Sequence, residues 1–548
     1  MFTIWFSWPA WSWVNTAGLV VANYLNNLWY KVYWDKEYQS IIKWWNNTFV
    51  LYVDEKDLFL TKNIDVFFVY DDFAILRNKQ VYNIKNVIKI DKQKDFIQNM
   101  ISIWSTFKIL RVSIDNAILY LKKYFSNKKL SKEVLDKNIN SLKKWYDLKI
   151  PAIYKIKNLN NDYMFEDWNK MIAKWALDGW LEFYSAYPMT PASSLIKYLS
   201  KKITFFQWED EIAVWMSMLW ARFAGKRAMC WTSWWWFALM SEWISFANQT
   251  EIGWIYVLSQ RWWPSTWTPT FTEQWDILFA CNASFWDTKP IVVSPNTFEN
   301  WYLLMKKVLD RWDIYQHPIV VLIDKQFSES YSSIKLSKFN NLKSSLDIKK
   351  IKFDQNNKEI FDKYEDLKNN KFLRYTITKN WISAYTYPWV KNWEFIASSY
   401  EHTESWFSTE DPEIKKVMTE KRHKKIETFI KNEFNNSFFW FEVVNPNANN
   451  FIVTQWINHI VTKKFVENNK SWWLITITVI QPLDTRLKKY LLKAEKIVFV
   501  ELNKSWQLQE IVTSKLWLNC EKYDWKISYL RKYNNYPLFI EDLEEKLL

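Results

Sequence analysis

Glycine is almost absent from this chain, with four residues in 548, whereas tryptophan occurs 40 times. An ordinary chain contains about 7% glycine, and tryptophan and glycine together make up roughly that share here. The tryptophans also stand where turns are expected, which require a positive φ or a close backbone approach. We therefore expect most of them to stand in place of glycine. The expected cause is a recoded stop codon that is read as glycine in the source and was translated here as tryptophan. The alternative is a genuinely aromatic-rich protein.

This hypothesis makes a structural prediction about the turns themselves. The indoles at positions 8, 11, 13, 44, 45, 262 and 263 are expected to occupy backbone conformations usually reserved for glycine. Such strain would follow from the substitution and would serve no function.

Cysteine and histidine are also scarce. Cys230, Cys281 and Cys520 lie far apart, which excludes a disulfide framework and an iron–sulfur cluster held by four cysteines of this chain. The four histidines show neither HxH nor HExxH spacing, so no metal site is expected.

Long apolar runs are missing as well. No uncharged apolar run reaches the length of about 18 residues that suggests a membrane span, and the N-terminus lacks the basic region of a secretory signal. The formal charge is +14, but the lysines are scattered along the chain, which argues against a nucleic-acid partner. We expect a soluble cytoplasmic protein with neither a nucleic-acid nor a membrane partner.

Apolar runs alternate with segments of helical period along most of the chain, which indicates an α/β protein with several domains. Residues 255–258 and 319–323 are short continuous apolar runs, typical of strands buried in a parallel sheet. The expected organisation is a first domain over residues 1–160, a second over 166–335, a connecting segment over 336–436 and a third domain over 437–548.

A turn near the N-terminus has the character of an anion-binding loop. Trp8, Trp11 and Trp13, taken as glycines, follow an apolar strand and open a helix at Val14. Backbone N–H groups at such a helix start can bind an anionic group. A tight turn with no ligand is the alternative.

Residues 187–191 form a loop in which two prolines flank Met189 and Thr190. The local pattern favours Thr190 as the N-cap of a helix that has Pro191 as its first residue. Thr190 could also donate a hydrogen bond to a carboxylate, and the two roles are compatible.

The acidic stretch at residues 209–211 opens an apolar helix. Acidic side chains at this end stabilise a helix through its dipole, and this is the simpler interpretation. The functional alternative is a buried carboxyl that polarises a heterocycle nitrogen, with a pKa raised by burial.

Arg261 follows the apolar run at residues 255–258, in a loop that also carries Ser265 and Thr266. Parallel α/β sheets bind ligands beyond the carboxyl ends of their strands. A guanidinium at such a position suits a carboxylate bidentately. A surface arginine in a loop is the alternative.

Six stretches carry a family resemblance once tryptophan is taken as glycine: YPMTPASS (187–194), EDEIAVWMSMLWARFAGKRAM (209–229), TSWWWFALMSEWISFA (232–247), QRWWPSTWTPTFTEQWD (260–276), WPAWSWVNTAG (8–18) and KEYQSIIKWWNN (36–47). With them, residues 166–330 resemble the alpha subunit of 2-oxoacid:ferredoxin oxidoreductases, most closely the 2-oxoglutarate type. Residues 401–427 are similar to its interdomain segment, and residues 500–512 to its C-terminal domain. Residues 1–53 resemble the gamma subunit, so the chain looks like a gamma–alpha fusion.

Two positions depart from the family pattern. Ser12 stands where the gamma loop usually carries glutamine, which leaves the contacts of that loop open. Trp235 stands where the alpha pattern tends to have proline.

The resemblance implies a Rossmann-like gamma domain, a thiamine diphosphate-binding pyrimidine-type domain and a transketolase C-terminal-like domain. The family decarboxylates 2-oxoacids oxidatively, forms acyl-coenzyme A and passes electrons to ferredoxin. Carried over, Glu211 contacts the aminopyrimidine of the cofactor, Arg261 holds the substrate carboxylate and Thr190 hydrogen-bonds near it. Glu211 is preferred to Glu209 because its spacing to residues 220–221 fits the family pattern. Tyr187, Ser265 and Thr266 join Arg261 in a substrate loop, and Trp8, Trp11 and Trp13 form a cofactor-binding loop.

The GDG…N motif that holds magnesium and diphosphate in thiamine enzymes has no counterpart here. The resemblance therefore implies a separate beta subunit that carries magnesium and an iron–sulfur cluster. 2-Oxoglutarate is the favoured substrate, with pyruvate or a branched-chain 2-oxoacid as the alternative. A subunit that only scaffolds the beta chain is another alternative, as is a basic binding protein if the tryptophans are literal.

Overall fold

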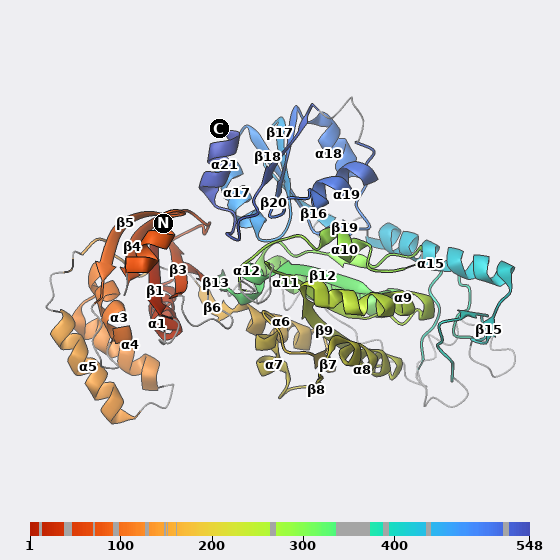
Figure 1. Ribbon diagram of the computed structural model, residues 1–548, viewed down its shortest axis with the longest axis horizontal. Helices are drawn as coiled ribbons and strands as arrows, with labels where there is room; N and C mark the ends of the chain where they lie inside the picture. Colours follow the sequence, from red (N-terminus) through yellow and green to blue (C-terminus); the bar gives the residue numbers. More distant parts are fainter. Residues whose placement is uncertain are drawn as a thin grey trace.

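The structure is a computed structural model in which three α/β parts are visible (Figure 1). The sheets of these parts have seven, seven and five strands. The predicted multi-domain α/β class is therefore confirmed, while the exact domain boundaries remain predictions. The structure describes residues 1–9, 14–37, 46–69, 72–90, 98–126, 131–146, 150, 152–159, 162–262, 270–285, 287–335, 373–386, 394–433, 440–518 and 525–548.

The N-terminal sheet has the order β5-β4-β1-β3-β2-β13-β6. Helix α1 packs against this sheet and against α3, and Gly18 of α1 lies so close to the ring of Phe49 that a Cβ atom would overlap it. The strands are β1 (Phe2–Pro9), β2 (Lys31–Glu37), β3 (Asn46–Asp54), β4 (Asn63–Val69), β5 (Asn83–Lys89), β6 (Tyr163–Asp167) and β13 (Tyr331–Lys335). The helices are α1 (Val14–Asn27), α2 (Asp72–Asn78), α3 (Gln98–Ile109), α4 (Ile114–Ser126) and α5 (Lys132–Tyr146).

Two strands of this sheet come from later in the chain. Strand β13 pairs antiparallel with β2, with Tyr331 opposite Trp34, and antiparallel with β6, with Tyr331 opposite Asp167. Strand β13 comes shortly after β12 (Ile319–Asp324) of the middle sheet, so backbone hydrogen bonds tie the chain of the middle part to the N-terminal sheet. They are therefore joined by more than a flexible linker.

The middle sheet has the order β19-β11-β12-β10-β9-β7-β8 and is parallel except for β19. Every residue of β9, β10 and β12 is buried, which explains their continuous apolar sequences. The strands are β7 (Phe183–Ala186), β8 (Thr204–Gln207), β9 (Ala228–Ser233), β10 (Ile255–Gln260), β11 (Ile291–Val293), β12 (Ile319–Asp324) and β19 (Val479–Gln481). The helices are α6 (Trp168–Asp178), α7 (Ser193–Leu199), α8 (Glu211–Phe223), the 3-10 helix η1 (Trp234–Met240), α9 (Ser241–Thr250), α10 (Ile277–Cys281), α11 (Phe298–Tyr315) and α12 (Lys325–Glu329).

The C-terminal sheet has the order β16-β18-β17-β20-β21, with β16 as an antiparallel edge strand. Strand β19 belongs to the C-terminal part in sequence but pairs with β11 of the middle sheet. Backbone hydrogen bonds therefore also join these two parts. The strands are β16 (Phe441–Val444), β17 (Asn450–Thr454), β18 (Trp472–Ile477), β20 (Lys496–Glu501) and β21 (Ile527–Arg531). The helices are α17 (Asn458–Asn468), α18 (Leu487–Lys493), α19 (Gln507–Lys515) and α21 (Ile540–Leu547).

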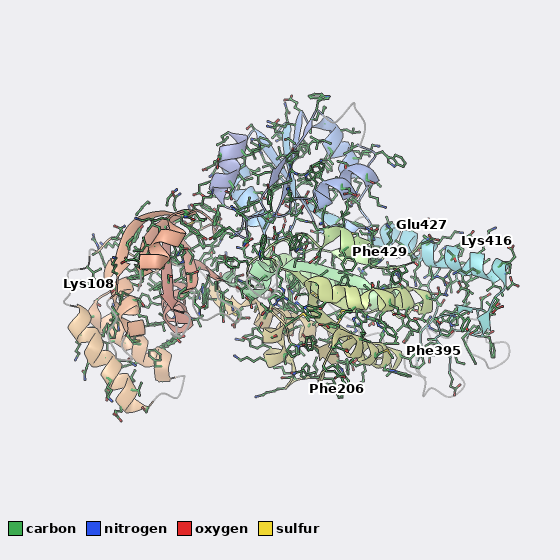
Figure 2. The ribbon with its side chains drawn as sticks, viewed as in Figure 1. Lys108, Phe206, Phe395, Lys416, Glu427 and Phe429 are labelled. Atoms are coloured by element: carbon green, nitrogen blue, oxygen red, sulfur yellow. The ribbon has the colours of Figure 1, made fainter. Side chains whose placement is uncertain are left out.

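The connecting segment contains β14 (Glu401–His402), β15 (Ser408–Thr409) and the long helix α15 (Pro412–Glu433). Helix α15 buries Phe429 and exposes Lys416 and Glu427, which Figure 2 labels along it. Within the described residues, no helix combines the length and apolar character that crossing a membrane requires.

Buried ion pairs fix α15 to the middle domain. Lys421 and Lys425 reach the two carboxylate oxygens of Glu251 at 2.5 and 2.7 Å. Burial alone would raise the pKa of Glu251, but the two ammonium groups hold it well below its usual range. Because the carboxylate is neutralised by two cations, its burial is tolerated.

Among the residues that the structure describes, seven tryptophans have a positive φ, a conformation that costs about 1–2 kcal/mol for a residue with a Cβ atom. Three of them follow helices: Trp29 (67°) after α1, Trp180 (64°) after α6 and Trp517 (56°) after α19. Helices very commonly end in a left-handed residue at this point, usually glycine. The other four are Trp381, Trp406, Trp456 and Trp506, with φ between 53° and 67°.

Buried indoles give a second observation of the same kind. Seven buried indole N–H groups have no hydrogen-bond partner within the described residues, although a buried tryptophan usually finds one. Both observations support the glycine hypothesis, which remains a prediction. These tryptophans are Trp5, Trp34, Trp104, Trp175, Trp215, Trp301 and Trp473.

The tryptophans for which the sequence predicted a glycine-like backbone do not show the positive φ where the structure describes them. Trp8 lies in the extended strand β1, and Trp262 is not among the residues of positive φ, so the expectation is wrong for both. Positions 11, 13, 44, 45 and 263 lie outside the described residues.

We predict that Trp180→Gly and Trp517→Gly each raise the free energy of unfolding by about 1 kcal/mol, because the strained φ is relieved and little burial is lost. Both side chains are more than half exposed, at 52% and 82%. Urea unfolding measures the change. Trp220→Gly is the control, since this exposed residue lies inside α8 and glycine should weaken the helix. Equal loss of stability in all three variants would contradict the hypothesis.

Candidate active site

Three neighbouring strand ends define the candidate active site. Strands β10, β9 and β7 run parallel and side by side, so their carboxyl ends lie at one edge of the middle sheet. Arg261 follows β10 directly, and the loop with Tyr187 and Thr190 follows β7. Beyond β7 lies β8, the outermost strand of the sheet, whose Phe206 is exposed (Figure 2). Glu211 is the first residue of helix α8, which follows β8 in the chain. The structure therefore brings Thr190, Glu211 and Arg261 to the same edge.

Glu211 is a buried carboxyl at the start of helix α8. Its side chain is 1% exposed, and its Oε1 has no hydrogen-bond partner within the described part of the chain. Burial raises its pKa, and the neighbouring Asp210 adds to the rise. Glu209 is exposed by contrast. A buried, unpaired carboxyl with a raised pKa favours the functional interpretation of this acidic stretch.

Asp210 carries out the helix-capping role that acidic residues can have here. Its Oδ1 accepts a hydrogen bond from the backbone N–H of Ala213 at 2.7 Å, and its backbone is extended as an N-cap requires. Glu211 is therefore not needed for capping.

Strand β9 contacts the loop at residues 187–191 through Ser233. The hydroxyl of Ser233 donates to the carbonyl oxygen of Thr190 at 3.0 Å and lies 3.2 Å from the sulfur of Met189. Helix α7 begins at Ser193 with Ala192 at the N-cap and no side-chain capping bond. The prediction that Thr190 caps this helix is therefore wrong, because the helix starts two residues later than Pro191.

Tyr187 and Thr190 are half-buried, and the ring of Tyr187 lies 6.5 Å from that of Trp236 in an edge contact. Ser265 and Thr266 of the predicted substrate loop lie outside the described residues, as do Trp11 and Trp13. The backbone of Trp8 pairs with Asn47 one residue before β1 ends at Pro9. The structure therefore places Trp8 near a strand end but does not describe the loop that follows.

Arg261 is 5% exposed at the end of β10. Its carbonyl oxygen accepts a hydrogen bond from the indole of Trp275 at 3.1 Å. A buried guanidinium is costly unless an anion neutralises it. This position therefore suits an anionic group, whether a ligand or a side chain.

Two acids in the stretch that follows the loop of Arg261 were not predicted from the sequence, namely Glu273 and Asp276. Both have a buried carboxylate oxygen with no hydrogen-bond partner among the described residues. Burial raises the pKa of Glu273 to about 8 and that of Asp276 to about 7, with Arg261 opposing the second shift. They are the only charged residues between positions 262 and 286, a signal that could have been noticed.

We predict that Glu273→Gln flattens the pH dependence of stability. The pKa of about 8 lies above the value of about 4.3 expected in an unfolded chain. The stability gained from the protonated form is therefore complete below pH about 4 and is lost as the pH rises through about 8. Thermal unfolding between pH 5 and 9 should show the advantage of the variant over wild type growing from pH 5 to about pH 8 and then levelling off. Parallel curves would show that Glu273 is ionised at neutral pH.

A domain model described as pyruvate flavodoxin/ferredoxin oxidoreductase, thiamine diphosphate-binding, matches residues 175–401. This range contains Thr190, Glu211 and Arg261. The unpaired oxygen of Glu211 fits this cofactor, because its pyrimidine ring offers a nitrogen that a protonated carboxyl can bind.

Two relatives and a solved structure give the same picture. The 2-oxoacid:ferredoxin oxidoreductase 1 alpha subunit of Sulfurisphaera tokodaii is 25% identical over 477 residues, 82% of this chain and 71% of the relative. The 2-oxoglutarate synthase subunit KorA of Methanocaldococcus jannaschii is 30% identical over 166 residues, 29% of this chain and 45% of the relative. A 2-oxoglutarate:ferredoxin oxidoreductase from Magnetococcus marinus, solved with 2-oxoglutarate, coenzyme A and succinyl-CoA, superposes with a TM-score of 0.84 at 21% identity, over 100% of this chain and 99% of that one. The resemblance predicted from the motifs is thus confirmed: the chain is related by sequence and by fold to the 2-oxoacid:ferredoxin oxidoreductases.

Proposed function

We propose that the chain is the gamma and alpha component of a thiamine diphosphate-dependent 2-oxoacid:ferredoxin oxidoreductase. It converts a 2-oxoacid and coenzyme A to acyl-coenzyme A and carbon dioxide, with electrons passed to ferredoxin. In this proposal residues 1–160 form the gamma domain, and the loop after Trp8 belongs to a cofactor-binding site. The observation that carries the proposal is the buried Glu211 carboxyl with an unpaired oxygen, at the same sheet edge as Arg261.

The roles of the side chains follow from their chemistry. Thiamine diphosphate, when bound, supplies the carbon nucleophile for the 2-oxo group and takes up the electrons released by decarboxylation. Burial raises the pKa of Glu211, which favours a proton shared between its Oε1 and a ring nitrogen of the cofactor. Arg261 binds the substrate carboxylate as a fixed cation, and the hydroxyl of Thr190 donates a hydrogen bond beside it.

A separate beta subunit completes the enzyme in this proposal. Within the described residues, no group of three histidine, cysteine or acidic side chains could hold a metal ion. The chain also lacks the diphosphate-binding motif and a set of four clustered cysteines. Magnesium and the iron–sulfur cluster therefore belong to the beta subunit, and the assembly works in the cytoplasm.

2-Oxoglutarate is the favoured substrate. This choice is supported by the name of the KorA relative and by the ligands named for the structure from Magnetococcus marinus. Pyruvate and branched-chain 2-oxoacids are the alternatives, because Arg261 and Thr190 bind only the head that all 2-oxoacids share.

Co-expressed with its beta subunit, the chain is predicted to reduce a viologen dye when given a 2-oxoacid and coenzyme A, with 2-oxoglutarate giving the highest kcat/KM. Reduction is measured by absorbance for 2-oxoglutarate, pyruvate and a branched-chain 2-oxoacid. The chain without its beta subunit is the control and should be inactive. If no 2-oxoacid supports reduction, the proposed activity is wrong and an aromatic-rich binding protein becomes the leading alternative.

Glu211→Gln is predicted to lower turnover of the assembled enzyme by about 100-fold or more, because one preorganised contact to the cofactor is lost. Glu209→Gln is the matched control, since this exposed acid lies two residues away and should leave turnover unchanged. Steady-state kinetics at saturating 2-oxoacid measures both. Full activity in Glu211→Gln would favour a subunit that only scaffolds the beta chain.

A further inference from the structure

Helix α8 presents an uncharged face to solvent. Its three exposed residues are Ile212, Met216 and Trp220, which are 46%, 36% and 63% exposed. They are spaced four residues apart, so they lie along one side of the helix, here called the outer face. No charged residue occurs between positions 212 and 221. If residue 220 is glycine, as the substitution hypothesis expects, the outer face stays uncharged and the backbone of a partner can approach it closely.

This composition is unusual for a helix at a surface. A surface helix normally has an apolar inner side and a charged outer side, whereas a helix that is apolar all round is buried. Helix α15 follows the first rule, since it exposes Lys416 and Glu427. Helix α8 follows the second rule although its outer face is exposed. The 3-10 helix η1, which packs on α8, also exposes an apolar residue, Leu239 at 44%.

Charged side chains flank the outer face instead of lying on it. Glu209 and Asp210 are exposed just before α8, and Lys226 is exposed just after it. An apolar centre with a charged rim is the arrangement of protein–protein interfaces. Figure 1 places α8 on the side of the middle part that faces away from the C-terminal part, so that part does not cover it.

The position of the outer face indicates its occupant. The face begins at Ile212, the residue after Glu211, whose unpaired Oε1 is the proposed contact to the cofactor. The chain lacks the motif that holds the diphosphate end of the same cofactor, so in the proposed function another chain holds that end. A cofactor bound to both chains brings the second chain within one cofactor length of Glu211. The outer face is an uncharged surface that starts at this point.

We propose that the outer face of α8, together with Leu239 of η1, is the surface on which the beta subunit docks. The inference rests on the proposed function, which requires a separate chain at the cofactor, and it deepens that function by naming the surface of contact. A second copy of this chain would need a patch that is complementary to itself, and it would bring no diphosphate site to Glu211.

The test is a titration of the beta subunit into Met216→Glu. Glutamate is a good helix former, so the variant chain alone should unfold at the wild-type temperature. Docking has to bury the new charge, so the concentration of beta subunit that gives half-maximal viologen reduction should rise about 10-fold or more. Turnover at saturating beta subunit should stay within about two-fold of wild type, because the substitution spares Glu211.

Leu119→Glu is the matched control, since Leu119 is an apolar residue that is 69% exposed in the middle of α4. It should leave the half-saturating concentration unchanged. An unchanged half-saturating concentration in Met216→Glu, whatever its turnover, overturns the docking surface and leaves the proposed function standing if the wild-type assembly reduces the dye. Should Met216→Glu fail to fold, Ile212→Lys decides by the same titration.

Sedimentation of the chain, alone and with the beta subunit, separates the remaining outcomes. If Met216→Glu dissociates a homo-oligomer and keeps wild-type affinity for the beta subunit, the face belongs to a second copy and the proposal is wrong. A lower unfolding temperature of the variant chain alone assigns the face to another segment of this chain and also overturns it. If the wild-type chains assemble without reducing the dye and Met216→Glu weakens the assembly, the proposed function fails while the docking surface stands.

Discussion

Strand β10 lies between β9 and β12 in a sheet whose central strands are buried on both faces. This pairing fixes where β10 ends and therefore where Arg261 lies relative to the sheet. The neighbouring strand β9 places Ser233 against the loop that contains Thr190. At the start of β10, Gly253 packs so tightly on the backbone of His317 that a Cβ atom would overlap it. The position of β10 is therefore fixed at both ends, and the geometry of the candidate site depends on it.

The three parts of the chain are coupled by exchanged strands. Strand β13 carries the middle part into the N-terminal sheet, and β19 carries the C-terminal part into the middle sheet. Buried polar side chains add to the second junction, where Gln274 joins Asp324 and Asn458. Because backbone hydrogen bonds cross both junctions, a displacement of one part would disturb the sheets of its neighbours. Gln274 bonds to Leu502 of the C-terminal part and Trp275 to the backbone of Arg261, so this stretch links the two.

Much of the local structure could be predicted from residue patterns. The opening strand, helix and strand match β1, α1 and β2, and the burial of Glu211 agrees with its preference over Glu209. The capping role given to Thr190 was wrong, because proline after threonine is typical of a helix start while the real start depends on packing two residues later. Glu273 and Asp276 were missed because their burial comes from segments far away in the sequence.

What the sequence determined by itself is the alternation of buried strands and helices, the family resemblance and the residue types of the candidate site. These follow from periodicity and from long motifs, which are local properties of the chain. It also predicted that many tryptophans stand for glycine, and the positive φ values after α1, α6 and α19 support this prediction. Tertiary structure alone decided which strands are exchanged between sheets and which carboxyls, such as those of Glu211 and Glu273, are buried. Those features depend on contacts between residues far apart in the sequence, and burial and charge pairing exist only once the chain has folded.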